Sequence, residues 1–427
     1  MKKLFLYIFI ISNTFIMYSQ SPYSFYGVGV NTFKGTMDNR SMGGLNVYSD
    51  SIHLNLTNPA SYSELKLVNY SVGVNYNKYN FKTDNTNESA SSGNINYLAV
   101  GIPTKHFNFG FGIIPQSSVE YFLTSTDETA VPERVNRYEG EGGVNTAFLT
   151  FGFKLFKRVD PETKVGKFIK NIGYGVTANY EFGNLRHTAS RFLKDIELST
   201  RLENNSSLSG VNFVYSTLIK EKIFKNLTLQ ATYIFKPASK LSSNNTQRLG
   251  TIPISGGYGG DFEDIDLAAL NLEKTKITIP KSNSFGIGVG EETKWFIGFD
   301  YTKVDGGGLD NKLFKLENVE FKKASKIAFG GFWIPKHDSF TSYFSRIVYR
   351  AGIRIEETGL HIQNQAINEF GINFGFGLPF QGFSNLNLGF EVGRRGTKNA
   401  GLIQEDFFSV RLGISLNDRW FVKTKYN

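Results

Sequence analysis

Charged side chains fall inside stretches of this chain that otherwise hold apolar and small residues. Arg346, Arg350 and Arg354 recur at a spacing of four, and Arg411 lies further along. Guanidinium groups on one face can hold a carboxylate through paired hydrogen bonds. We predict that Arg350, Arg354 and Arg411 face the inside of a barrel together with three acids, Glu181, Asp300 and Glu391. Two interpretations stay open: a site for a ligand carboxylate, or internal ion pairs such as Arg411 with Glu391, because buried charges need partners.

Catalytic and metal chemistry has little support in the sequence. The five histidines are scattered without the spacing of metal ligands, and no nucleophile elbow of a Ser-His-Asp enzyme is present. Cysteine is absent, which removes disulfides, thiol catalysis and cysteine-bound metal. We therefore expect no enzyme activity, no cofactor and no metal.

A compact polar segment precedes the first long β pattern. Gly43 and Gly44 allow a tight turn or a close approach to another surface. Asn58 stands before Pro59 and is therefore kept out of the α region. Together with Asp50 and Ala60, these residues predict a hatch, or plug, over residues 21–66. The alternative is a turn-rich arm with no gating role.

The N-terminus has the pattern of a secretory signal peptide. Lys2 and Lys3 precede an apolar run from Leu4 to Met17, which is too short to span a bilayer comfortably. We assign residues 1–20 to the signal peptide. Its removal lowers the formal charge from +9 to +7 (9 − 2 = 7). This mild excess is spread along the chain, so we expect no nucleic-acid partner.

Residues 67–416 alternate between apolar and polar positions. Val68, Tyr70, Val72, Val74 and Tyr76, for example, alternate with polar or small residues, as expected of a strand with one apolar face. The polar faces hold mainly Gly, Asn, Ser and Thr, which suits a confined lumen. Connections alternate between long and short, as in outer-membrane barrels. About fourteen strands are predicted: 67–78, 94–103, 106–115, 144–156, 171–184, 210–220, 226–236, 283–291, 293–303, 325–335, 345–356, 369–379, 385–395 and 406–416.

These strands predict an all-β fold, a closed antiparallel transmembrane barrel with the plug in its lumen. No apolar run, in the signal peptide or after it, reaches the roughly 18 residues of a membrane helix. Only helices and closed barrels satisfy their backbone groups in lipid. We expect the outer membrane of a Gram-negative bacterium, with membrane lipid and lipopolysaccharide around the wall. Residues 417–427 are interpreted as a periplasmic tail or the end of the last strand.

Several motifs resemble the outer-membrane long-chain fatty-acid transporter family (FadL-like). Tyr26-Gly27, Met42-Gly43-Gly44, Asp50 and Asn58-Pro59-Ala60 are similar to its N-terminal hatch. Gly393-Arg394-Arg395-Gly396-Thr397 and Asp418-Arg419-Trp420-Phe421 look like a poorly characterised branch. The resemblance implies a plugged barrel of 14 strands. It also implies passive uptake of hydrophobic molecules, such as long-chain fatty acids or aromatics, which bind inside, shift the hatch and leave through the wall.

Two functions of different classes follow from the sequence. The first is uptake of a hydrophobic small molecule. The second is a non-enzymatic accessory barrel of an outer-membrane protein assembly or secretion complex, suggested by long outer loops and a basic tail. An esterase or phospholipase is the weakest possibility, because no triad is visible. A continuous apolar tunnel past the plug would favour uptake.

Overall fold

The computed structural model describes residues 21–155, 166, 169–224, 226–253, 260–306, 313, 316–380 and 382–420. The predicted signal peptide and residues 421–427 of the predicted tail lie outside the described residues.

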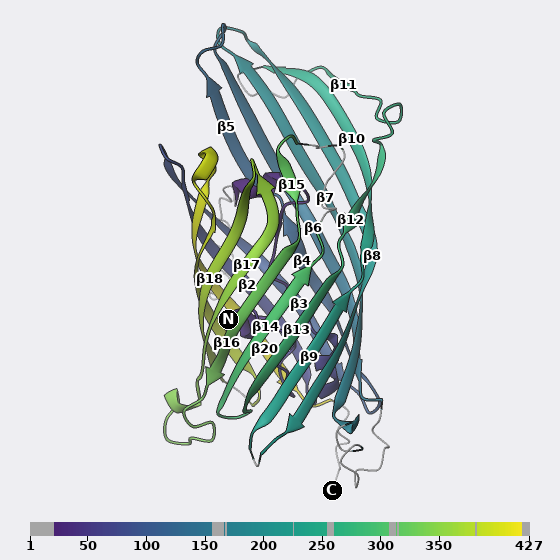
Figure 1. Cartoon of the computed structure of the whole chain (residues 1–427), viewed down its shortest axis with the longest axis vertical. Helices are drawn as coiled ribbons and strands as arrows, with labels where there is room; N and C mark the ends of the chain where they lie inside the picture. The colour runs from purple at the N-terminus through teal and green to yellow at the C-terminus, as the bar shows by residue number, and fades with distance from the viewer. Residues whose placement is uncertain are drawn as a thin grey trace, which may run out of the picture.

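The chain forms a closed antiparallel barrel of fourteen membrane-spanning strands (Figure 1). Neighbouring barrel strands pair in chain order, and β2 pairs with β20 to close the wall. The barrel strands are β2 (Val68–Lys82), β3 (Asn87–Pro103), β4 (Asn108–Ser118), β6 (Arg134–Phe153), β7 (Ile172–Leu193), β8 (Leu198–Lys222), β9 (Thr228–Lys236), β13 (Ser282–Glu291), β14 (Trp295–Val304), β16 (Ala324–Trp333), β17 (Val348–Ile362), β18 (Gln365–Pro379), β19 (Asn385–Gly396) and β20 (Gln404–Asp418).

The predicted alternation places the side chains as expected. On β2, Val72, Val74 and Tyr76 are 37%, 41% and 43% exposed on the outside of the barrel, whereas Ser71 and Asn77 are buried on the lumen side. Outward apolar side chains contact lipid, and inward polar side chains line the lumen. Each of the fourteen predicted strands therefore has a counterpart in the structure.

Three strands continue far beyond their predicted ends. β6, β7 and β8 have 20, 22 and 25 residues, compared with 10 in β14. They rise with β5 (Tyr121–Asp127), β10 (Ser239–Pro253), β11 (Phe262–Asp264) and β12 (Lys274–Ile279) above the rest of the outer rim, and this sheet is here termed the outer extension (Figure 1). The predicted strands stopped too early because water bathes the sheet there, so its outer face need not be apolar.

The remaining outer and periplasmic elements are short. β15 (Val319–Phe321) pairs with β17 in an outer connection, and β20 ends two residues beyond the predicted boundary of the barrel. Two 3-10 turns lie in connections: η4 (Phe344–Arg346) before β17 and η5 (Asn399–Gly401) before β20. Arg346 therefore lies in η4 and stacks on Tyr343. Its predicted place on the same strand face as Arg350 is wrong, because β17 begins only at Val348.

Within the residues that the structure describes, no helix is long and apolar enough to cross a membrane.

Candidate functional site: the plug, its chamber and a seam in the wall

The plug, residues 21–66, runs through the lumen along most of the height of the barrel. It contains η1 (Pro22–Phe25), β1 (Val30–Asn31), α2 (Met37–Ser41) and η2 (Pro59–Glu64). At its outer end Ser21 donates its backbone N–H to Glu120 O at 3.3 Å. At its periplasmic end Ala60 donates to Ser216 Oγ at 2.7 Å. The segment is thus fixed to the wall at both ends.

Gly43 and Gly44 form the turn that follows α2. Their φ angles are +75° and +82°, the left-handed region that glycine adopts without strain. A Cβ on Gly43 would lie 2.6 Å from Ile353 O on the wall. The turn therefore needs glycine both for its backbone conformation and for its close approach to β17.

Asp50 organises the loop between α2 and η2. One carboxylate oxygen accepts the backbone N–H groups of Ile52 and His53 at 2.9 and 2.8 Å, and the other lies 2.6 Å from His53 Nδ1. Burial alone would raise the pKa of Asp50, but the charge and hydrogen bonds of His53 outweigh it and hold that pKa well below its usual range. Burial would likewise lower the pKa of His53, but Asp50 and Asp38 raise it above its ordinary value.

Asn58, Pro59 and Ala60 begin η2. Asn58 has the extended conformation expected before proline, with φ −118° and ψ 96°, and its carbonyl accepts the N–H of Ser61 at 3.1 Å. Asn58 and Ala60 are fully buried. The Asn-Pro-Ala motif therefore fits the base of the plug tightly into the periplasmic end of the lumen.

A network of buried charges joins the centre of the plug to the wall. Arg40 of α2 binds Glu391 of β19 through two hydrogen bonds of 2.7 and 2.8 Å. Arg354 also binds Glu391, at 2.9 Å, and Arg411 pairs with the same carboxylate. Asp38 of the plug pairs with Arg350 at 2.6 Å. Four adjacent strands, β17 to β20, supply the wall side of this network.

Further acids neutralise the same arginines. Glu369 pairs with Arg354, and it accepts a hydrogen bond of 2.7 Å from Arg395 Nε. Arg395 reaches Glu405 at 3.3 Å. Each of the predicted arginines Arg350, Arg354 and Arg411 thus has an internal carboxylate partner. The geometry therefore favours internal ion pairing over an open arginine ladder.

The other two predicted lumen charges lie elsewhere. Asp300 on β14 accepts the backbone N–H of Asn46 in the plug. Glu181 on β7 pairs with Lys236 at 3.4 Å. The six predicted charges therefore face the lumen but occupy three separate places.

Sequence reasoning missed five partners in the network: Asp38, Arg40, Glu369, Arg395 and Glu405. The last three lie an even number of residues from Asn373, Glu391 and Arg411 on the same three strands. They therefore face inward as well, so strand alternation could have found them. Nothing comparable marks the two plug residues, because α2 is too short for a helical pattern.

Two apolar clusters fill the lower lumen. Met42, Leu45 and Val47 of the plug pack against Phe296 and Phe332 of the wall. A second cluster joins plug residues Leu54, Tyr62 and Leu65 to the wall through Tyr97 and Phe148. Met42, Leu45 and Val47 have no exposed surface. The plug therefore packs directly against the wall at this level.

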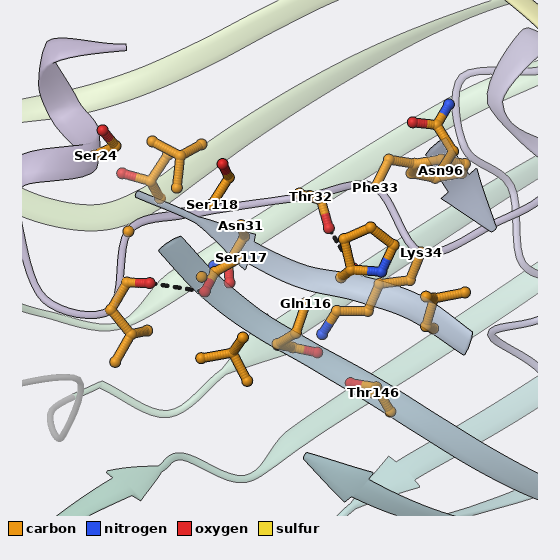
Figure 2. Close-up of a pocket in the computed structure, with 18 of the residues that line it drawn as sticks. Ser24, Asn31, Thr32, Phe33, Lys34, Asn96, Gln116, Ser117, Ser118 and Thr146 are labelled. Carbon is orange, nitrogen blue, oxygen red and sulfur yellow. Dashed lines mark hydrogen bonds between the residues drawn. The ribbon is translucent and has the colours of Figure 1, made fainter. Parts of the chain in front are cut away.

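A chamber of about 1070 Å³ lies between the N-terminal part of the plug and the wall. Its lining mixes asparagine, serine, threonine and charged side chains with many apolar and aromatic ones. Figure 2 shows Lys34, Asn96, Gln116 and Thr146 around it. Burial and the charge of Lys236 lower the pKa of Lys34 to about 7, against the raising effect of Glu181 and Glu356. The lining is therefore mixed, and a ligand in the chamber would meet apolar surface together with polar groups that could orient it.

The wall has a seam between β3 and β4. These strands pair only from Leu98 with Ile113 down to Pro103 with Asn108. Above that level β3 pairs, among the residues that the structure describes, with β2 alone. The edge of β4 pairs there with β1 of the plug, Val30 with Ser118 and Asn31 with Ser117. Asn94, Ile95 and Asn96 on one side and Gln116 to Ser118 on the other all line the chamber. The chamber therefore extends to the seam.

The seam begins at the height of the lipid. Ile95 pairs with Val74, which is exposed on the apolar outer face of β2. Ile95 and Leu98 are themselves 65% and 56% exposed. The lower end of the seam is thus bordered by side chains that contact lipid.

A family profile for BamG matches residues 1–427, the full length of the chain. The chain belongs to the BamG family. Among curated protein sequences, none matches this BamG-family barrel.

Solved structures share the fold at low sequence identity. The toluene transporter TbuX of Ralstonia pickettii has a TM-score of 0.57 and 12% identity, over 91% of this chain and 100% of its own. The toluene transporter TodX of P. putida has a TM-score of 0.56 and 14% identity, over 91% and 99%. A FadL homologue of Pseudomonas aeruginosa has a TM-score of 0.53 and 11% identity, over 91% and 98%. The barrel therefore has the FadL-like fold expected from the sequence, and it is an outer-membrane protein.

Proposed function

We propose that this BamG-family barrel is an accessory subunit of an outer-membrane protein assembly or secretion complex and that it presents a partner-binding sheet outside the membrane. The outer extension is the observation that carries this proposal. At about 3.4 Å per residue, the 25 residues of β8 span roughly 85 Å, whereas a membrane-crossing strand needs about 9–11 residues. A channel needs no ordered sheet of this height. A rigid sheet beyond the lipid suits a partner that must be held in a fixed position.

The extension is built as a stable unit with its own core. Val119, Val144, Leu185, Leu208 and Leu241 form a buried cluster on its inner face. The plug covers this cluster with Val28 and Phe25. Plug and extension are therefore one packed body, and the plug supports the extension as well as filling the lumen.

The ion pairs that hold the plug in place also support the accessory role. Moving α2 out of place would separate Arg40 from Glu391 and Asp38 from Arg350, both of which are buried. Breaking a buried pair by removing one partner costs about 3–5 kcal/mol. A plug held in this way suits a barrel whose task does not require solute to pass through its centre.

Isolation from native outer membranes in mild detergent tests the proposal. We expect a stoichiometric protein partner. His187 pairs with Asn204 across the β7–β8 hairpin. Deleting residues 187–204 therefore shortens both strands equally and leaves the membrane-spanning part intact. We expect this variant to lose the partner while still migrating as a folded, heat-modifiable barrel. A barrel that is always isolated alone with lipid would contradict the proposal.

A second function, uptake of hydrophobic small molecules, is favoured by the seam. The chamber reaches the seam at lipid height, and β1 of the plug borders it, so displacement of β1 would join the chamber to the membrane. The toluene transporters named above share the fold. Uptake of radiolabelled toluene or a long-chain fatty acid should fall in a deletion strain if this function holds. Unchanged uptake would count against it.

A further inference from the structure

The seam leaves one edge of β3 without a neighbouring strand in the described part of the chain. Thr83 donates its backbone N–H to Thr86 O at 3.0 Å. Thr83 and Thr86 are therefore a hydrogen-bonded pair, and this pair shows which of the following pairs of the β2–β3 hairpin are bonded. Bonded and non-bonded pairs alternate along an antiparallel ladder, and the pairing is continuous from Lys82–Asn87 to Val74–Ile95. The residues that direct their N–H and C=O groups away from β2 are therefore Asn87, Ser89, Ser91, Gly93 and Ile95.

No strand among the described residues pairs with these groups. The edge is long, nine residues from Asn87 to Ile95 or roughly 31 Å. Natural edge strands are usually short, or carry lysine, proline or a bulge that prevents pairing. This edge has neither lysine nor proline between Asn87 and Ile95, and its register shift lies below Ile95. It is therefore open to pairing along nearly its full length.

The lower end of the edge has a further requirement. Gly93 and Ile95 lie opposite Tyr76 and Val74, whose side chains mark the upper part of the lipid-facing band. A backbone group without a hydrogen bond costs several kcal/mol in lipid. Lipid chains cannot supply these bonds, whereas a polypeptide strand can.

We infer that the β3 edge accepts an extended segment of a partner protein as an added strand. This inference rests on the proposed accessory role and names the mode of contact. Such addition takes its affinity from main-chain hydrogen bonds and its specificity from alternate side chains. The pairing of β1 with the opposite edge of the seam shows the same mode within the chain.

The surroundings define the segment that fits. Its inward side chains lie beside Asn94 and Asn96, which line the chamber, so they are polar. An outward side chain beside Ile95 meets lipid and is apolar. At the outer end Asp84 and Glu88 form no ion pair with any described residue, so a basic side chain complements them. The expected partner segment is thus a strand with an apolar residue at one end and a lysine or arginine at the other.

Hydrogen exchange distinguishes a free edge from an occupied one. In the barrel separated from its partner, the even-numbered amides from Glu88 to Asn94 are hydrogen-bonded to β2 and exchange slowly. The five amides that point away from β2 exchange fast. In the complex isolated from native membranes, we expect five additional protected amides in a peptide covering residues 87–96. A central wall peptide of β7, residues 174–182, serves as the control and should not change.

Proline substitution tests the same edge without breaking the barrel. Ser89→Pro and Ser91→Pro remove N–H groups that have no bond to β2, and proline is tolerated at such positions. We expect each to reduce the recovered partner at least tenfold while the barrel still folds. The matched variants Ser89→Ala and Ser91→Ala keep the N–H and should keep the partner.

The experiments distinguish failure of the strand-addition inference from failure of the accessory role. If a stoichiometric partner is recovered but residues 87–96 gain no protection and the proline variants retain it, the inference is overturned and the accessory role stands. If the five amides are already protected in the lone barrel, the chain itself, or a second copy, occupies the edge, and the inference is overturned. If no preparation contains a partner, the accessory role falls together with the inference.

Discussion

Replacing Glu391 by glutamine tests how the plug is held. The Glu391 carboxylate has no exposed surface and binds three guanidinium groups, those of Arg40, Arg354 and Arg411. Glu391→Gln keeps the size of the side chain and removes its charge. The three cations then face one another with one carboxylate fewer, and a broken buried pair costs about 3–5 kcal/mol. Since 1.4 kcal/mol is a factor of ten, we expect the displaced plug to become on the order of 10²- to 10³-fold more populated.

A single cysteine reports this opening, because the chain has no cysteine of its own. Ser41 at the end of α2 is buried and close to the wall, so Ser41→Cys should react with a maleimide only when α2 leaves its place. When opening and closing are fast, the labelling rate follows the open population. We therefore expect the rate in Ser41→Cys to rise by the same two to three orders of magnitude when Glu391→Gln is added. Conductance in planar bilayers should rise in parallel.

Two further variants make the experiment decisive. Glu356→Gln removes an acid that also pairs with Arg354, at 3.4 Å, but its side chain is 32% exposed. Its effect should stay within about 1 kcal/mol, as for other partly exposed pairs. Arg40→Met removes one cation and leaves Glu391 paired with the other two arginines, so its effect should be smaller than that of Glu391→Gln. Equal labelling rates in Glu391→Gln and Glu356→Gln, with both barrels folded, would refute the claim that this network holds the plug.

Three other predictions follow from the plug. The pKa of His53 is raised, so its contribution to plug seating is complete below the ordinary value of about 6.5 and is lost as pH rises through the raised pKa. Labelling of Ser41→Cys should therefore increase over that range by more than the thiol's own reactivity does, and His53→Gln should remove this additional increase. Gly43→Ala should destabilise the barrel by roughly 1–3 kcal/mol through its backbone and the contact with β17, measured by the temperature of heat modification, whereas Gly382→Ala, with φ +59° and open space around it, should cost only about 1 kcal/mol. Lys34, with a pKa of about 7, should react with a small acylating reagent at neutral pH, where surface lysines remain protonated; mass spectrometry showing Lys34 no faster than Lys294, which is 59% exposed, would contradict that pKa.

The strand pattern was readable from the sequence because lipid and lumen impose opposite demands on alternate residues. Val72, Val74 and Tyr76 illustrate this: each outward position must be apolar, so the period of two is strict. The same reasoning explains where prediction stopped. Above Tyr76 on β2, and along the upper parts of β6 to β8, both faces meet water or polar neighbours, and alternation no longer marks a strand.

The plug could be predicted as a unit but not in its contacts. Gly43-Gly44 and Asn58-Pro59 restrict the backbone locally, and the local structure agrees with that expectation. The bond between Arg40 and Glu391 joins residues 351 positions apart. No local pattern encodes such a pair, because it depends on how α2 lies against β19 once the wall has closed.

By itself, the sequence determined that the chain is an outer-membrane barrel of about fourteen strands with a plug, because membrane burial acts on every residue of every strand. The tertiary structure decided which charges pair, since four arginines of β17 to β20 and Arg40 of α2 meet their acids only once the wall has closed around the plug. It also decided that β3 parts from β4 at Leu98. Pairing of neighbouring strands depends on where the plug lies and on strand register, and the alternation of side chains does not encode either of them.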